Sequence, residues 1–246
     1  MIKAVLFDLW GTLILDDPAS GEARRLLRVE SACAALAAAG FPYEAADVEA
    51  GFLAAGVEHQ RLHEDDLDLS THGRSVAYLR HVDTTLADRL DDAAWQGMHD
   101  AILTPALTHR PAIMPGARET LAAAKSLGLL RGLISNTGIT PGFVLRELLD
   151  GFGLLEHLDC TVFSDEVEIC KPAEAIFVRA LEEIGVDAGD AVFVGDQPRL
   201  DVFGSRRAGM WCVQIGDLIS DGVEPHARIS QLDELLPALR ALKLIG

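Results

Sequence analysis

A chain of 246 residues, 49% apolar and 24% charged, is long enough to bury a sizeable core and too apolar for global disorder. Its formal net charge of −17 argues against partners that need a basic face, so we expect neither nucleic acid nor an anionic membrane to bind. The four cysteines form no C-x-x-C pair, which favours reduced thiols in a cytoplasmic protein over a disulfide frame or a zinc site. The N-terminal residues lack the pattern of a signal peptide or a membrane span. No feature of the sequence indicates an oligomeric state.

The first predicted element is a strand at residues 4–7, where the continuous apolar run AVLF is typical of a strand buried on both faces. Apolar residues at helical spacing then predict four helices within residues 16–107, where no strand pattern occurs. A polar stretch at residues 62–73 predicts a loop among them. We therefore expect an all-α insert, residues 16–107, between the two parts of a core formed by residues 1–15 and 108–246.

Beyond residue 108 the pattern alternates between strands and helices. Strands are predicted at 129–134, 160–163, 191–194 and 211–215, and helices at 117–127, 140–149, 172–184, 201–208 and 232–242. This alternation predicts an α/β fold with a parallel sheet covered by helices on both faces. Ligands of such sheets bind beyond the carboxyl ends of the strands. Asp8, Ser135 and Asp196 each fall at such an end, so we expect them to share one site.

Asp8 follows the first strand directly, and an ionised carboxylate there is costly unless a metal, a cation or several donors compensate it. A carboxylate in this position can act as a nucleophile, a metal ligand or both. Taken alone, Asp8 is equally consistent with a side chain that caps the following turn.

Three further fragments could complete a site with Asp8. Asp196 and Asp201 lie on a tight turn where hard oxygen atoms can collect Mg²⁺, although alone they would fit a helix cap and a first-turn acid better. Ser135 and Asn136 offer a hydroxyl and an amide to orient anionic oxygens, or they serve only the turn that follows. Lys171 would add an ammonium that holds the substrate charge and Asp8, whereas an isolated lysine is usually solvated.

In this order and on these strand ends, the fragments resemble the four motifs of the haloacid dehalogenase superfamily. The motifs are Phe7-Asp8-Leu9-Trp10-Gly11-Thr12, Ser135-Asn136, Lys171-Pro172, and Gly195-Asp196 with Asp201. The resemblance covers the whole chain, because that family carries its helical cap between the first two motifs, at the place of the predicted insert. It implies a Rossmann-like core with an inserted all-α cap, and a hydrolase that acts on a small, phosphorylated substrate.

The resemblance also implies a role for each motif residue. The nucleophile would be Asp8, and Mg²⁺ would be held by Asp8, Asp196 and the backbone carbonyl of Trp10, with Thr12 and Asp201 in support. The transferring group would be clamped by Ser135, the Asn136 amide and Lys171.

Trp10 departs from the pattern of the family's phosphatases, which usually carry Asp there to protonate the leaving oxygen and activate water. An indole N–H donates a hydrogen bond but cannot exchange a proton usefully. Substrates with good leaving groups, such as acyl and aryl phosphates, are therefore favoured, unless the substrate or the cap supplies the proton. His59, His63 and His72 flank the polar stretch of the insert, but we favour solvated surface histidines for them.

Two alternatives to a Mg²⁺-dependent phosphatase stay open. The dehalogenase branch also has an aromatic residue at the Trp10 position and a Ser-Asn second motif, and halide leaves without protonation. Asp196 opposes that reading, because it resembles a metal ligand and the dehalogenases work without metal. The third reading is a catalytically quiet member that binds a phosphorylated ligand or a protein, which Trp10 supports and the intact Asp8 and Lys171 oppose.

Overall fold

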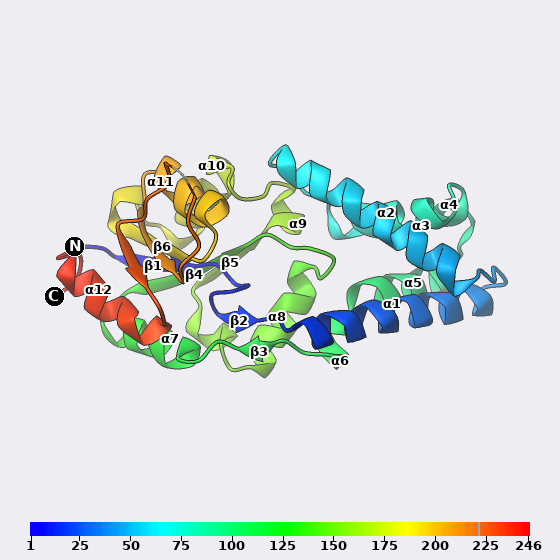
Figure 1. The fold of residues 1–246 in the computed structure, drawn as a ribbon, viewed down its shortest axis with the longest axis horizontal. Coiled ribbons are helices and arrows are strands. Elements are labelled where there is room, and N and C mark those ends of the chain that lie inside the picture. The colour runs from blue at the N-terminus through cyan, green and yellow to red at the C-terminus, as the bar shows by residue number, and fades with distance from the viewer. Residues whose placement is uncertain (221) are drawn as a thin grey trace.

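The computed structural model describes residues 1–220 and 222–246 as a two-part molecule (Figure 1). One part contains a six-stranded, entirely parallel sheet of order β5-β4-β1-β6-β7-β8. Its strands are β1 (Ala4–Phe7), β4 (Leu130–Ser135), β5 (Cys160–Phe163), β6 (Ala191–Gly195), β7 (Trp211–Ile215) and β8 (Ala227–Ile229). The predicted α/β fold is confirmed, and β8 is a strand that the sequence pattern did not predict.

Helices cover both faces of this sheet because each strand alternates its side chains between two cores. Val5 and Phe7 of β1 face a core shared with helices on one side, and Ala4 and Leu6 face a second core on the other. The first core is closed by α7 (Ala117–Ser126), α8 (Gly142–Gly151) and α12 (Leu235–Ala241), and the second by α10 (Glu174–Ile184). The remaining short helical pieces are α9 (Ser164–Val167), the π-helical η3 (Pro198–Phe203), α11 (Gly204–Arg207) and the 3-10 helices η1 (Leu155–His157), η2 (Ala188–Asp190) and η4 (Leu232–Glu234).

The second part is helical, has its own apolar core, and is inserted after β1. Its helices are α1 (Pro18–Ala38), α2 (Ala45–Glu64), α3 (Thr71–Val82), α4 (Leu86–Arg89), α5 (Asp92–Leu103) and α6 (Pro105–Thr108). The four predicted helices are present, and the short α4 and α6 are additional. This helical part is the cap expected from the sequence, whereas its bounds at residues 16 and 107 stay a proposal.

Two segments differ from the sequence prediction. The stretch 62–73 was expected to be a loop, but α2 continues to Glu64 and α3 already begins at Thr71. Ser70 explains the early start of α3, since its side chain accepts a hydrogen bond from the Gly73 N–H and caps the helix. The strands β2 (Ile14–Leu15) and β3 (Ala112–Ile113) also form an antiparallel pair where the chain leaves the core and returns to it.

All four cysteines are free, as expected from their spacing, whereas the cytoplasmic location stays a prediction. Among the described residues, every helix is too short or too polar to cross a bilayer.

Candidate active site

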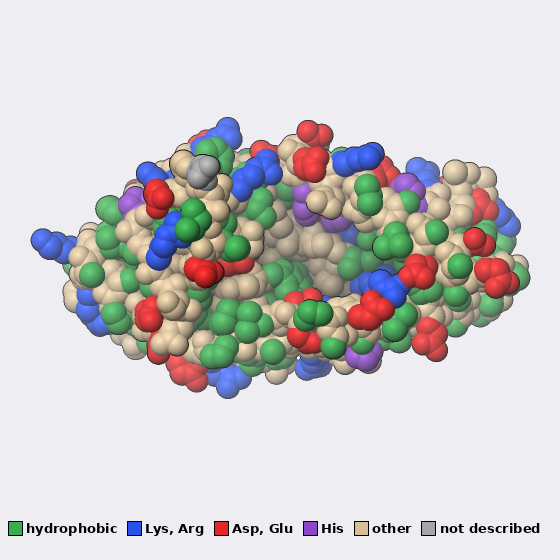
Figure 2. Space-filling model, in the orientation of Figure 1, with side chains coloured by type: hydrophobic (Ala, Val, Ile, Leu, Met, Phe, Trp, Pro, Cys, Tyr) green, Lys and Arg blue, Asp and Glu red, His purple; other side chains and the backbone are tan. Residues whose placement is uncertain are grey.

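The predicted site residues from three strands lie together at the carboxyl edge of the sheet. Asp8 follows β1, Ser135 ends β4 and Asp196 follows β6. Because β1 pairs in parallel with β4 on one side and β6 on the other, these strand ends are neighbours. The cap faces this edge (Figure 1), and Figure 2 shows the surface hollowed between the two parts.

Lys171 links two of the carboxylates at this edge. Its Nζ donates to Asp8 Oδ1 at 2.6 Å and to Asp201 Oδ1 at 2.7 Å, and the side chain is only 2% exposed. Burial opposes the charge of this ammonium, but the carboxylates of Asp201 and Asp8 outweigh burial and raise the pKa of Lys171. Lys171 is therefore a fixed positive charge beside Asp8.

Asn136 holds the backbone of Lys171 in place. Its Nδ2 donates to the Lys171 carbonyl at 2.9 Å, and its Oδ1 accepts from the Lys171 N–H at 2.7 Å. The Nδ2 group has a second N–H, so the expected role of this amide in orienting anionic oxygens of the substrate stays a prediction. The nearby Ser135 is fully buried, and its hydroxyl donates to the Asn136 carbonyl at 3.2 Å.

The three acidic residues bring more negative charge than Lys171 can balance. Oxygen atoms of Asp8, Asp196 and Asp201 lie within 4.8 Å of one another. Burial raises the pKa of Asp8 to about 7, because the neighbouring carboxylates add to the burial cost and Lys171 offsets only part of it. Burial and the charge of Asp201 also raise the pKa of Asp196.

The same cluster leaves oxygen atoms without partners. Asp196 Oδ1 and Thr12 Oγ1 are buried and have no hydrogen-bond partner among the residues that the structure describes. Both oxygens of Asp201, in contrast, are in use, since Oδ1 accepts from Lys171 and Oδ2 accepts from the Gln197 N–H at 2.9 Å. A cation held by oxygen ligands would give Asp196 Oδ1 a partner and would also balance the excess negative charge.

The segment between Asp8 and Thr12 passes tightly over this cluster. Gly11 has a φ of +78°, and a Cβ at this position would lie 2.7 Å from Asp196 Oδ2. Only glycine fits both the conformation and the space. Trp10, the preceding residue, is half-buried and packs against the main core of the sheet.

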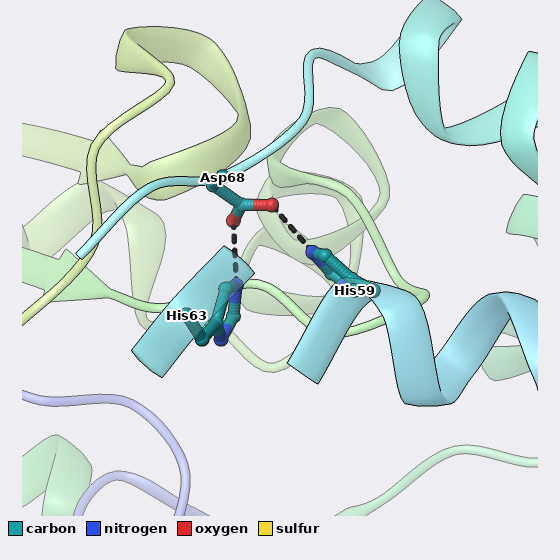
Figure 3. A group of neighbouring side chains, drawn as sticks. All are labelled: His59, His63 and Asp68. Atoms are coloured by element: carbon teal, nitrogen blue, oxygen red, sulfur yellow. Dashed lines mark hydrogen bonds and ion pairs between the residues drawn. The ribbon is translucent and has the colours of Figure 1, made fainter. Parts of the chain in front are cut away.

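A buried junction around Asp68 joins the cap to the same edge (Figure 3). On the cap side, His59 Nε2 lies 2.5 Å and His63 Nε2 3.2 Å from the Asp68 carboxylate, and Arg74 donates to it at 2.9 Å. On the core side, Ser164 donates to Asp68 Oδ2 at 2.5 Å. The preference for solvated histidines is thus wrong for His59, which is buried because its ring pairs with Asp68.

The core residue Thr137, next to Asn136, extends this junction toward the predicted site. Arg74 donates to the Thr137 hydroxyl at 2.9 Å, and the Thr137 N–H donates to Ser164 Oγ at 2.7 Å. The backbone carbonyl of the nearby cap residue Asp66 accepts from the N–H of Cys170, which immediately precedes Lys171. No pattern in the sequence predicted this junction. The only available signal was that Thr137 and Ser164 directly follow predicted strands or motif residues.

The junction has the donor atoms of a metal site, but its charge balance favours a structural role. Nitrogen and oxygen atoms of His59, His63 and Asp68 lie within 4.8 Å of one another. Burial opposes ionisation of Asp68, yet its histidine partners and Arg74 outweigh burial and hold the pKa of Asp68 well below its usual value. A divalent cation at Asp68 would face the guanidinium of Arg74, which already supplies the positive charge.

Comparisons with known proteins identify the family and the fold. A family model described as haloacid dehalogenase-like hydrolase matches residues 2–209. The chain is 30% identical to a glyceraldehyde 3-phosphate phosphatase of Methanopyrus kandleri, over 98% of this chain and 99% of that protein. It is 39% identical to a phosphoserine phosphatase of Thermus thermophilus, over 51% of each chain. In fold it is similar to a 2-haloacid dehalogenase of Pseudomonas syringae pv. Tomato, with a TM-score of 0.74 and 24% identity over 98% of this chain and 100% of that one.

Proposed function

The chain belongs to the haloacid dehalogenase-like hydrolases. We propose that it is a Mg²⁺-dependent phosphatase whose nucleophile is Asp8. The observation that carries the proposal is the buried cluster of three carboxylates around a single ammonium, with Asp196 Oδ1 left unpaired. A metal-free site would have little reason to bury this excess of negative charge.

The residues present fit a magnesium ion. Asp8, Asp196 and the backbone carbonyl of Trp10 would hold it, because hard oxygen atoms are the ligands that Mg²⁺ prefers. Asp201 would act in support, since its oxygens are already bonded to Lys171 and the Gln197 N–H. When bound, the ion would neutralise negative charge on the transferring group.

The chain's own residues would carry the covalent chemistry. Asp8 would attack phosphorus through its carboxylate, forming an aspartyl-phosphate and releasing the leaving group. Lys171 would balance the charge of the transferring group as well as that of Asp8. Ser135 and the Asn136 amide would orient anionic oxygens, and Asn136 would also fix the backbone of Lys171.

Trp10 would bias the enzyme toward phosphates with good leaving groups, because no carboxyl group two residues after Asp8 can protonate the leaving oxygen. The phosphatase names of several relatives support phosphate chemistry. Glyceraldehyde 3-phosphate and phosphoserine are alkyl phosphates, so turnover of such compounds here would need a proton from the substrate or another residue.

Dehalogenation is the second candidate, and Trp10 is the observation that favours it. Displacement of halide from carbon needs no proton donor, so an indole at this position would carry no penalty. Asp196 opposes this reading, because a metal-free reaction leaves its buried Oδ1 without a partner among the described residues.

One assay separates these readings. Hydrolysis of 4-nitrophenyl phosphate and release of chloride from 2-chloropropionate are measured in EDTA and after Mg²⁺ is restored, with Asp8→Asn as the inactive control. The proposal expects phosphate release that EDTA abolishes and Mg²⁺ restores. Chloride release undiminished in EDTA would support the dehalogenase, and no turnover of either substrate would support a binding protein.

A further inference from the structure

A pocket is formed mainly by helices of the cap. It has a volume of about 200 Å³ and is formed by α1, α2, α3 and one residue of the core, Ile139. Its apolar lining consists of Val29, Phe52, Leu53, Tyr78 and Ile139. Ile139 follows Asn136 by three residues, so one wall of the pocket belongs to the segment that carries Ser135 and Asn136 of the candidate active site.

Arg28 brings a buried positive charge into this apolar pocket. Its side chain lines the cavity, and the residue is only 7% exposed. Its Nε donates to the Ile102 carbonyl at 2.7 Å, which is one of the last carbonyls of α5 and has no partner within the helix. Within residues 1–220 and 222–246, neither terminal guanidinium nitrogen of Arg28 has an acceptor, and no carboxylate pairs with it.

The two other arginines of α1, in contrast to Arg28, form ion pairs with carboxylates. Arg24 is paired with Asp16, and Arg25 is paired with Glu22 and Glu49. Arg28, in contrast, is buried without a counter-ion among the described residues, and burial lowers its pKa to about 10. Capping α5 uses only Nε of Arg28, so the two terminal nitrogens of its guanidinium remain available to bind a ligand.

Tyr78 supplies a second unused donor to the same pocket. The residue is 5% exposed, and its hydroxyl has no hydrogen-bond partner in the described part of the chain. Its ring packs edge-on against Phe52, with ring centroids 5.2 Å apart. A guanidinium fork and a phenol between aromatic and aliphatic walls match an anion attached to an apolar body.

We propose that Arg28 and Tyr78 bind a carboxylate of the substrate, so that the enzyme acts on phosphate esters that also carry a carboxylic acid on an apolar stem. The substrate half of this inference rests on the proposed phosphatase function. Arg25 and Glu49 also line the pocket, but they pair with each other, which leaves Arg28 as the lining charge to be balanced. A carboxylate fits better than a second phosphate, because the Arg28 guanidinium balances one negative charge and the rest of the lining is mostly apolar. The pocket also provides the local positive charge that an anionic substrate needs on a chain of net charge −17.

Binding of a simple acid tests the pocket independently of any turnover. We would titrate 3-phenylpropionate and the uncharged 3-phenylpropanamide into the full-length protein by NMR. The wild-type protein should bind the acid roughly ten- to hundredfold more tightly than the amide, and Arg28→Gln should lose this preference. Gln can still donate to the Ile102 carbonyl, and Arg110→Gln is the matched control, because Arg110 Nε also caps a helix carbonyl, that of Leu107, outside the pocket.

If Arg28→Gln does not fold, Tyr78→Phe keeps the ring and removes only the hydroxyl, and it should weaken binding of the acid severalfold. Equal binding of acid and amide by the wild-type protein, or unchanged preference in Arg28→Gln, would overturn the carboxylate pocket.

Inhibition of aryl phosphate hydrolysis tests the link to the substrate. The acid should inhibit hydrolysis of 4-nitrophenyl phosphate competitively in the wild-type protein and in Arg110→Gln, and much more weakly in Arg28→Gln. Non-competitive inhibition would place the pocket outside the substrate site. A protein that binds the acid but hydrolyses no phosphate would refute the proposed function and leave the pocket standing.

Discussion

Replacing Asp8 by Asn should stabilise the metal-free protein while abolishing its activity. In the folded chain Asp8 is buried beside two other carboxylates and one ammonium, and its pKa is raised to about 7. In the unfolded chain an aspartate titrates near a pKa of about 3.9. Folding therefore becomes less favourable as the pH rises from about 4 to about 7, by up to about 4 kcal/mol for a shift of roughly three pKa units.

Asn removes this cost because it is neutral at every pH. Its carbonyl oxygen can still accept from Lys171, although the neutral hydrogen bond is weaker by about 1 kcal/mol. We therefore expect a net gain of about 1–3 kcal/mol in the free energy of unfolding at pH 8. The gain should be largely lost near pH 4, where the carboxyl is protonated in the folded state and roughly half protonated in the unfolded state.

Urea unfolding in EDTA at pH 8 and pH 4 measures this gain. Saturating Mg²⁺ should then stabilise the wild-type protein at pH 8 and have much less effect on Asp8→Asn. Glu182→Gln, an exposed acid-to-amide change on α10, is the control and should change stability by less than about 0.5 kcal/mol. A metal-free Asp8→Asn protein that is less stable than wild type at pH 8 would refute the claim that the site without metal buries more negative charge than Lys171 balances.

Two further changes test the acid–base argument and the cap junction. Trp10→Asp should raise hydrolysis of alkyl phosphates relative to aryl phosphates, by up to roughly a hundredfold, because it restores a proton donor. The ratio of the two kcat/KM values is the readout, and an unchanged ratio in an enzyme that already cleaves alkyl phosphates would mean that another residue is the acid. Asp68→Asn should destabilise the protein by about 2–4 kcal/mol at pH 7, since it leaves Arg74 unpaired in the interior. Because the folded pKa of Asp68 is depressed, its carboxylate stabilises the fold above about pH 4 and loses this effect below it. A loss of unfolding free energy in Asp68→Asn that is equal at pH 7 and pH 3, measured by urea unfolding, would contradict the charge argument.

The sheet and its site could be predicted because local patterns carry that information. The apolar run at β1 and the strand–helix alternation after residue 108 specify a parallel sheet, and parallel strands bring their carboxyl ends to one edge. Asp8 and Asp196 meet there for that reason, without any long-range knowledge of contacts.

The junction and the arginine pocket could not be predicted, because both depend on how the cap sits on the core. Asp68 lies in a stretch rich in acids and other polar residues, and its burial follows only from contacts with residues such as Ser164 and Arg74. Arg28 lies on a helix that also carries two other arginines, and sequence spacing cannot show which of them lacks a counter-ion. The short strands β2 and β3 were missed for a different reason, since two residues each give no periodicity.

The covalent state of Asp8 during turnover tests the account most directly. Protein mixed with 4-nitrophenyl phosphate and Mg²⁺ is quenched rapidly with acid and treated with borohydride, which reduces an acyl phosphate to an alcohol, and its peptides are analysed by mass spectrometry. We predict that the reduced side chain appears at Asp8, only when both substrate and Mg²⁺ are present. Phosphate release with Asp8 unmodified, or with the label on another residue, would contradict the assignment of Asp8 as the nucleophile.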